Sequence, residues 1–124
     1  MWNKKIILIL EDEIEFRDTL SSLLRDQGYE VIEVTTAEEG LRKIDERIPD
    51  LIIADIKLPG IDGFDFFYEL RKNAAYRIIP FVYLTAFNNL EAAKRAKQQG
   101  AADYITKPFE LDYLISRVRM LLTP

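Results

Sequence analysis

Short apolar segments alternate five times with amphipathic segments along this chain of 124 residues. The spacing predicts strands at residues 5–10, 30–34, 51–55, 81–85 and 103–105. Alternation of a strand with an amphipathic helix is typical of βαβ units, which assemble into a parallel sheet. The middle strands are apolar at nearly every position, as expected for strands that are buried on both faces. The sequence therefore predicts an α/β fold around a five-stranded parallel sheet.

Apolar residues recur at helical spacing between these strands and predict five helices. The first helix is expected to end at Gly28, because glycine is favoured where a helix terminates. The second is expected to begin at Thr36, since Glu39 three residues later completes a capping-box pattern. The helices are marked by Phe16, Leu20, Leu23 and Leu24 in the first, Leu41 and Ile44 in the second, Phe64, Phe67 and Leu70 in the third, residues 90–99 in the fourth, and Leu111, Leu114, Ile115, Val118 and Leu122 in the fifth.

The chain has the length of one ordinary domain, and its content of 48% apolar and 31% charged residues is typical of a globular protein. No linker, internal repeat or low-complexity stretch divides it, so we expect a single domain over residues 1–124. The apolar run at residues 6–10 is too short to cross a membrane, and no stretch is typical of a signal peptide. We therefore expect a cytoplasmic protein with no membrane partner.

The residue types that are absent exclude several kinds of site. Without cysteine the chain forms no disulfide or thiolate metal site, and without histidine it has no imidazole base, ligand or phosphodonor. The net charge of −4 disfavours binding to nucleic acid, whose phosphate backbone requires a basic face. We expect no nucleic acid partner for this chain alone.

Side chains capable of chemistry stand at the ends of four predicted strands. Residues 11–13 (Glu-Asp-Glu) follow the first strand, Asp55 closes the third, Thr85 closes the fourth and Lys107 follows the fifth. Open α/β sheets place their chemistry at the carboxyl ends of strands. A carboxylate nucleophile, a metal-binding acid pair, a hydroxyl donor and a fixed cation are the groups needed to move a phosphoryl group onto an aspartate.

From about residue 4 to residue 122 the chain resembles the receiver domain of two-component response regulators, the CheY-like superfamily. The matching segments are residues 7–13 (ILILEDE), Asp55 with Pro59 and the Asp62-Gly63 turn, residues 83–86 (YLTA) and residues 102–109 (ADYITKPF). All of them occur in order and at strand ends. The resemblance implies a flavodoxin-like three-layer sandwich with strand order 2-1-3-4-5 and five helices.

In receiver domains the residue that matches Asp55 accepts a phosphoryl group in a reaction that depends on Mg²⁺. The resemblance implies that Asp12 and Asp55 ligate the metal directly, that the backbone carbonyl of Lys57 is a third ligand, and that Glu11 orients a bound water. Oxygen atoms are the ligands that Mg²⁺ prefers. Lys107 would offset the negative charge that gathers in the transition state.

The resemblance also implies a signalling switch. The Thr85 hydroxyl would donate to the phosphoryl oxygens and draw the loop 86–89 inward, and Tyr104 would then swing inward. This movement would change the surface of the fourth helix, fifth strand and fifth helix. A cis peptide bond is implied before Pro108. The implied partners are a sensor histidine kinase or a phosphotransfer protein, which donates the phosphoryl group, and a downstream protein or output domain.

Several residues also have plainer interpretations. Glu13 suits a helix cap better than a metal site, Thr85 suits a strand because it is β-branched, and Asp55 could cap the turn that follows it. One alternative function is a scaffold domain regulated by binding alone, which would not need the complete set of site residues. A second is a flavin-binding protein, but no glycine- or serine-rich phosphate loop follows the first strand.

Lys57 and Phe87 depart from the common family pattern and flank the expected path of hydrolytic water. Neither is suited to orient water as a general base, so we expect an acyl phosphate that is long-lived unless a phosphatase acts. The alternative is that both are exposed residues with no role. A second question concerns Asp103, Arg117 and Arg119, which lie where transcription factors of the family form intersubunit ion pairs. Residue 102 is alanine where an acid is common in the family. This partial match predicts a weak homodimer, and the alternative is a solvated helix face.

Overall fold

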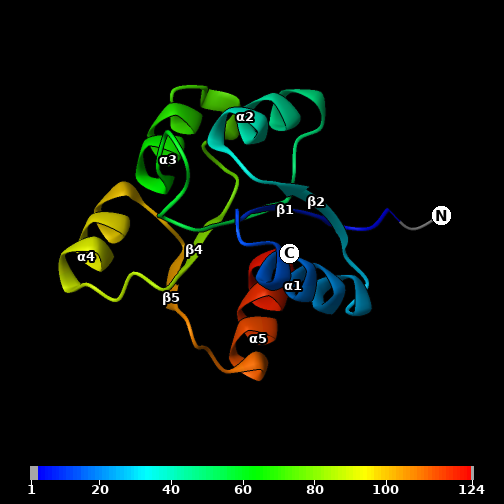
Figure 1. Ribbon diagram of the computed structural model, residues 1–124. Coiled ribbons are helices and arrows are strands. Elements are labelled where there is room, and N and C mark those ends of the chain that lie inside the picture. Colours follow the sequence, from blue (N-terminus) through cyan, green and yellow to red (C-terminus); the bar gives the residue numbers. More distant parts are fainter. Residues whose placement is uncertain (1–2, 124) are drawn as a thin grey trace.

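Five parallel strands form one sheet in the order β2–β1–β3–β4–β5 in the computed structural model, which describes residues 3–123 (Figure 1). The strands are β1 (Ile6–Leu10), β2 (Glu30–Val34), β3 (Leu51–Ala54), β4 (Phe81–Thr85) and β5 (Asp103–Thr106). Every pairing between neighbours is parallel. The predicted strand order is confirmed, and the predicted strand ends are wrong by one residue at Lys5, Asp55 and Thr106.

Helices cover both faces of the sheet and give the predicted three layers (Figure 1). The helices α1 (Ile14–Asp26) and α5 (Leu111–Leu122) lie on one face, and α2 (Ala37–Glu46), α3 (Gly63–Arg71) and α4 (Leu90–Gln99) lie on the other. A short 3₁₀ helix, η1 (Ala74–Tyr76), precedes β4. The sequence pattern did not predict it, because three residues are too few to show a helical repeat. None of the helices within residues 3–123 has the length and apolar character needed to span a membrane.

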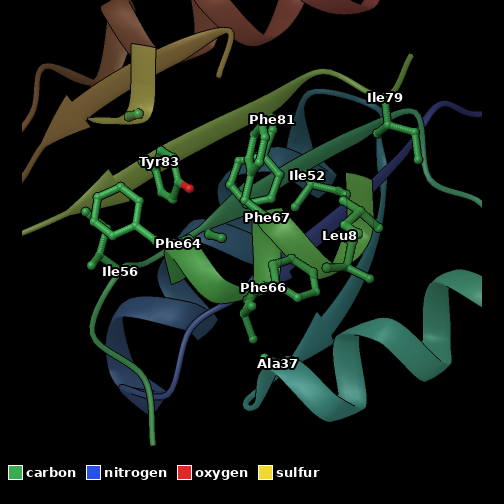
Figure 2. Packing of buried hydrophobic residues seen from close by; sticks show 14 of the residues in the cluster. Leu8, Ala37, Ile52, Ile56, Phe64, Phe66, Phe67, Ile79, Phe81 and Tyr83 are labelled. Carbon is green, nitrogen blue, oxygen red and sulfur yellow. The ribbon is translucent and has the colours of Figure 1, made fainter. Parts of the chain in front are cut away.

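Alternate side chains of the central strands enter two separate cores. Leu8, Phe81 and Tyr83 pack with residues of α2, α3 and α4, whereas Ile9 and Val82 pack with residues of α1 and α5. Figure 2 shows the aromatic side chains of α3 lying against Phe81 and Tyr83. Every residue of β3 and β4 is buried, as predicted for central strands. The sheet therefore presents its carboxyl edge on strands that are packed from both sides.

Side chains near the helix ends satisfy free backbone groups. The Glu13 carboxylate accepts a hydrogen bond from the backbone N–H of Phe16 at 3.2 Å, so Glu13 caps α1 as predicted. The Thr36 hydroxyl accepts one from the backbone N–H of Glu39 at 3.1 Å and begins α2, also as predicted. Gly28 follows α1 with a φ of 96°, a left-handed conformation that glycine adopts without strain.

Candidate functional site

A cleft of about 420 Å³ opens at the carboxyl edge of the sheet. It is lined by residues at the ends of β1, β3, β4 and β5: Glu11, Asp12, Glu13, Asp55, Lys57, Thr85, Ala86, Phe87 and Lys107. Every residue predicted to take part in phosphoryl transfer or metal binding therefore lies around one cleft. Tyr104, the predicted switch residue, is not part of this lining.

The Asp55 carboxylate is held in one orientation. The residue is 8% exposed, and its Oδ1 accepts hydrogen bonds from the Thr85 hydroxyl at 2.5 Å and from the backbone N–H of Ile56 at 2.6 Å. The other oxygen, Oδ2, lies 3.3 Å from the Nζ of Lys107. Because the two shorter hydrogen bonds are both directed at Oδ1, Oδ2 accepts only from Lys107 among these groups and keeps a lone pair that a nucleophile needs.

The Lys107 ammonium connects two carboxylates. Its Nζ lies 2.7 Å from Oε1 of Glu11 and 3.3 Å from Oδ2 of Asp55, and the Lys107 side chain is 18% exposed. Burial raises the pKa of Glu11, and the hydrogen bond from Lys107 acts in the opposite direction. Both partners of the Lys107 ammonium in the cleft are therefore acidic. The peptide bond between Lys107 and Pro108 is cis, as expected.

The loop that carries Glu11 is fastened to the start of α1. The Oε2 of Glu11 accepts a hydrogen bond from the backbone N–H of Glu13 at 3.0 Å, and the Arg17 guanidinium donates to the backbone carbonyl of Glu11 at 3.0 Å. Arg17 also lies 3.5 Å from a carboxylate oxygen of Glu33. The sequence did not single out Arg17, because one arginine on an amphipathic helix is typical of a solvated face.

The acidic side chains of the cleft do not form a compact metal cluster. Within residues 3–123 no group of three or more aspartate, glutamate, histidine or cysteine side chains has that geometry. The predicted set needs only the carboxylates of Asp12 and Asp55 together with the backbone oxygen of Lys57. Asp12 is exposed at the cleft, whereas Oε1 of Glu11 is engaged by Lys107. This all-oxygen donor set is of the kind that Mg²⁺ prefers.

A series of hydrogen bonds runs from the cleft to β5. The Thr85 hydroxyl oxygen accepts from the backbone N–H of Phe87 at 3.1 Å, and the Tyr104 hydroxyl donates to the backbone carbonyl of Phe87. Tyr104 is half-buried. Burial raises the pKa of the Tyr104 hydroxyl, and the charge of Asp55 acts in the same direction. Tyr104 thus contacts the loop after β4 without entering the cleft.

Lys57 and Phe87 meet at the cleft. The Nζ of Lys57 lies 5.1 Å from the centroid of the Phe87 ring, which is within the range of a cation–π contact. The sequence placed both residues beside the site but gave no sign that they touch each other, because they lie on loops after different strands.

The residues considered for a dimer make contacts inside one chain. The Nε of Arg117 lies 2.7 Å from Oδ2 of Asp103, and the Tyr113 hydroxyl donates to the same oxygen at 3.0 Å. Arg119 donates to the side-chain oxygen of Gln27 at 3.3 Å. Asp103 and Arg117 are therefore already paired in the single chain.

Comparison with known proteins identifies the family. The family model of the response regulator receiver domain matches residues 7–119. This chain belongs to that family. It is 37% identical over 118 residues to the transcriptional regulatory protein PdtaR of Mycobacterium tuberculosis, a match that covers 94% of this chain and 56% of PdtaR. It is 35% identical over 116 residues to the phosphate regulon transcriptional regulatory protein PhoB of Escherichia coli, with 94% and 51% covered.

Solved receiver domains share the fold. The receiver domain protein from Methanospirillum hungatei has a TM-score of 0.90 and 31% identity over 97% of this chain and 94% of that chain. The non-phosphorylated receiver domain of HemR from Leptospira biflexa has a TM-score of 0.88 and 30% identity over 98% and 96%. The predicted family and fold are confirmed, and the chain spans about half the length of the curated relatives named above. It is a receiver domain of two-component signalling.

Proposed function

We propose that this receiver domain is a phosphorylation-controlled switch, that residues 1–124 act as one such domain, and that Asp55 is the phosphoacceptor. The observation that carries the proposal is the arrangement of the Asp55 carboxylate. The Thr85 hydroxyl holds Oδ1, and Oδ2 lies 3.3 Å from Lys107 at an open cleft. A carboxylate held in one orientation beside a fixed cation is suited to attack on phosphorus.

The phosphoryl donor is a phosphohistidine of a sensor histidine kinase or of a phosphotransfer protein. Oδ2 of Asp55 attacks phosphorus in line, the new oxygen–phosphorus bond forms, and the nitrogen–phosphorus bond to the donor imidazole breaks. The imidazole keeps the electron pair and takes up a proton from water. Lys107 then donates to the phosphoryl oxygens and offsets their charge. The chain in this way promotes its own modification and converts no external substrate.

Mg²⁺ is the proposed cofactor. Asp12, Asp55 and the backbone carbonyl of Lys57 would hold the ion, and Glu11 would contact it through a bound water. When bound, Mg²⁺ supplies positive charge beside phosphoryl oxygens that the acidic side chains of the cleft would otherwise repel. The chain's own contribution is to hold these oxygen atoms on the loops that follow the buried strands β1 and β3, and the Lys107 ammonium on the loop that follows β5.

Intact mass spectrometry after incubation with acetyl phosphate, a small phosphoryl donor, tests the proposal. We expect one phosphoryl adduct in the presence of Mg²⁺ and none when EDTA removes the ion. The phosphoryl mimic beryllofluoride should bind under the same conditions. A folded protein that forms no adduct and binds no mimic would contradict the proposal and favour a scaffold domain.

Phosphorylation of Asp55 would change the surface of α4, β5 and α5 through Thr85. A phosphoryl group on Asp55 presents new acceptor oxygens, so the Thr85 hydroxyl turns toward them and the loop that contains Phe87 follows. Tyr104 moves with this loop because its hydroxyl donates to the Phe87 carbonyl. The surface of α4, β5 and α5 then changes its fit to a downstream protein or output domain. Unchanged solvent exposure of Tyr104 on adding beryllofluoride, measured by NMR, would contradict this route.

The acyl phosphate is expected to be long-lived in Mg²⁺, because neither Lys57 nor Phe87 supplies a general base for water. Their contact at the cleft also restricts the approach of water to phosphorus. Phe87→Ala should therefore accelerate hydrolysis several-fold in a decay assay followed by intact mass. Leu90→Ala removes an exposed side chain that does not line the cleft and should leave the decay unchanged. Rapid spontaneous loss of the phosphoryl group from the protein without substitutions would refute this expectation.

Self-association of this chain is proposed to be weak. A dimer built on the ion pairs of Asp103, Arg117 and Arg119 would have to exchange contacts that these residues already make within the chain. Exposed or partly exposed pairs contribute little individually. Sedimentation velocity with and without beryllofluoride measures the association, and a tight dimer in the absence of the mimic would contradict this proposal.

A further inference from the structure

The ring of Phe16 is a third partner of the Lys107 ammonium. The Nζ of Lys107 lies 3.9 Å from the centroid of this ring, in addition to its contacts with Glu11 and Asp55. An ammonium this close to a ring face is attracted by the negative face of the aromatic quadrupole. Phe16 does not line the cleft, so it touches the ammonium without touching what the cleft binds.

Phe16 is itself held from two directions. Its backbone N–H donates to the Glu13 carboxylate that caps α1, at 3.2 Å. Its ring meets the ring of Phe109 edge to face, with centroids 6.0 Å apart and an angle of 87° between the planes. Phe109 lies two residues after Lys107, in the loop that leads to α5. The backbone of Phe16 is therefore fixed in the first turn of α1, and its ring packs against the loop that carries the lysine.

An aromatic ring can hold the ammonium without neutralising it. A third carboxylate in the same place would cancel the charge and take hydrogen-bond donors that the phosphoryl oxygens need. The contact with Glu11 is already shorter than the contact with Asp55, at 2.7 Å against 3.3 Å. An extra attraction from the ring restricts the ammonium to one region, so that its shorter contact with Glu11 does not draw it away from Asp55.

We propose that Phe16 is a positioning residue for phosphoryl transfer, because its ring holds the Lys107 ammonium beside Asp55 through a cation–π contact. This inference rests on the proposed roles of Asp55 and Lys107. The ring of Phe16 thus has an electrostatic effect on Lys107 that an apolar side chain of the same volume does not have.

Mono-, di- and trifluorinated phenylalanines at position 16 test the inference in the full chain. Fluorine withdraws electrons from the ring face and weakens the cation–π contact, while the ring keeps its shape. We expect the rate of Mg²⁺-dependent phosphorylation by acetyl phosphate to fall with each fluorine, by roughly three- to tenfold for the trifluorinated ring. The same series at Phe109 changes the packing of the same aromatic pair and should leave the rate within about twofold. Thermal unfolding of each protein checks that the fold is retained.

The possible failures are distinguishable. The positioning role would be overturned if the chain with ordinary phenylalanine is phosphorylated and fluorination at position 16 does not change the rate. Equal losses at positions 16 and 109 would also overturn it, because packing would then explain both. Phe16→Leu keeps apolar volume without a ring and should lose as much rate as the trifluorinated protein. If the chain with its natural residues forms no phosphoryl adduct, the proposed function itself is contradicted.

Discussion

Asp55→Asn is expected to abolish phosphorylation by acetyl phosphate while the protein remains folded. The amide that replaces the carboxylate is not a nucleophile toward phosphorus. Its carbonyl oxygen can still accept the hydrogen bonds that the Thr85 hydroxyl and the backbone N–H of Ile56 now donate to Oδ1. Intact mass followed over time should therefore show no adduct, and circular dichroism should show an unchanged fold.

Asp18→Asn is the matched control for this change. Asp18 is an exposed carboxylate on α1 and does not line the cleft, so the loss of its charge should leave the rate of phosphorylation unchanged. Adduct formation in Asp55→Asn at the rate of Asp18→Asn would show that the phosphoacceptor is another residue. The same result would remove the basis for the roles proposed for Thr85 and Lys107.

Gly63→Ala is expected to destabilise the protein by about 3 kcal/mol, as an overpacked site does. Gly63 begins α3 and lies against the backbone of Asp55 and Ile56. A Cβ at this position would stand 2.3 Å from the carbonyl oxygen of Asp55 and 2.8 Å from the Cα of Ile56. The backbone N–H of Gly63 also donates to the carbonyl of Ile56 at 2.7 Å, so neither segment can shift alone. Urea unfolding measures the change in free energy.

Gly28→Ala separates steric overlap from the general cost of replacing a glycine. Gly28 has a φ of 96°, and nothing lies within 4 Å of a Cβ built there. The expected cost is about 1 kcal/mol, from the left-handed backbone alone. Gly63→Ala should also slow phosphorylation, because the backbone that must move is that of Asp55. An equal loss of stability for the two substitutions would mean that the close approach of Gly63 to the backbone of Asp55 and Ile56 has no additional effect on stability.

The sheet could be predicted because its information is local. The apolar runs at residues 51–54 and 81–84 are continuous, so their burial on both faces follows from the residue types alone. The sequence predicts one site for Asp55, Thr85 and Lys107 because parallel strands end at the same edge, and the three residues do line one cleft. Asp55 lies one residue beyond β3, and this difference matters little because the residue still begins the loop of the cleft.

The supporting contacts could not be predicted, because they join segments far apart in the sequence. Phe16 has the spacing of a core residue on α1, and only the fold brings its ring to Lys107. Arg17 has the appearance of a surface charge until the Glu11 carbonyl is placed beside it. The sequence places Gly63 in a turn, but its closeness to Asp55 depends on how α3 packs. In each case tertiary packing, and not local pattern, sets the role.

The most direct test of the central claim is to locate the phosphoryl group on the chain. Borohydride reduces an aspartyl phosphate to homoserine, so reduction after treatment with acetyl phosphate and Mg²⁺, followed by peptide sequencing in a mass spectrometer, marks the modified residue. We expect homoserine at position 55 and no change at any other aspartate. Homoserine at Asp12, or at any other aspartate in place of Asp55, would contradict the assignment of Asp55 as the phosphoacceptor.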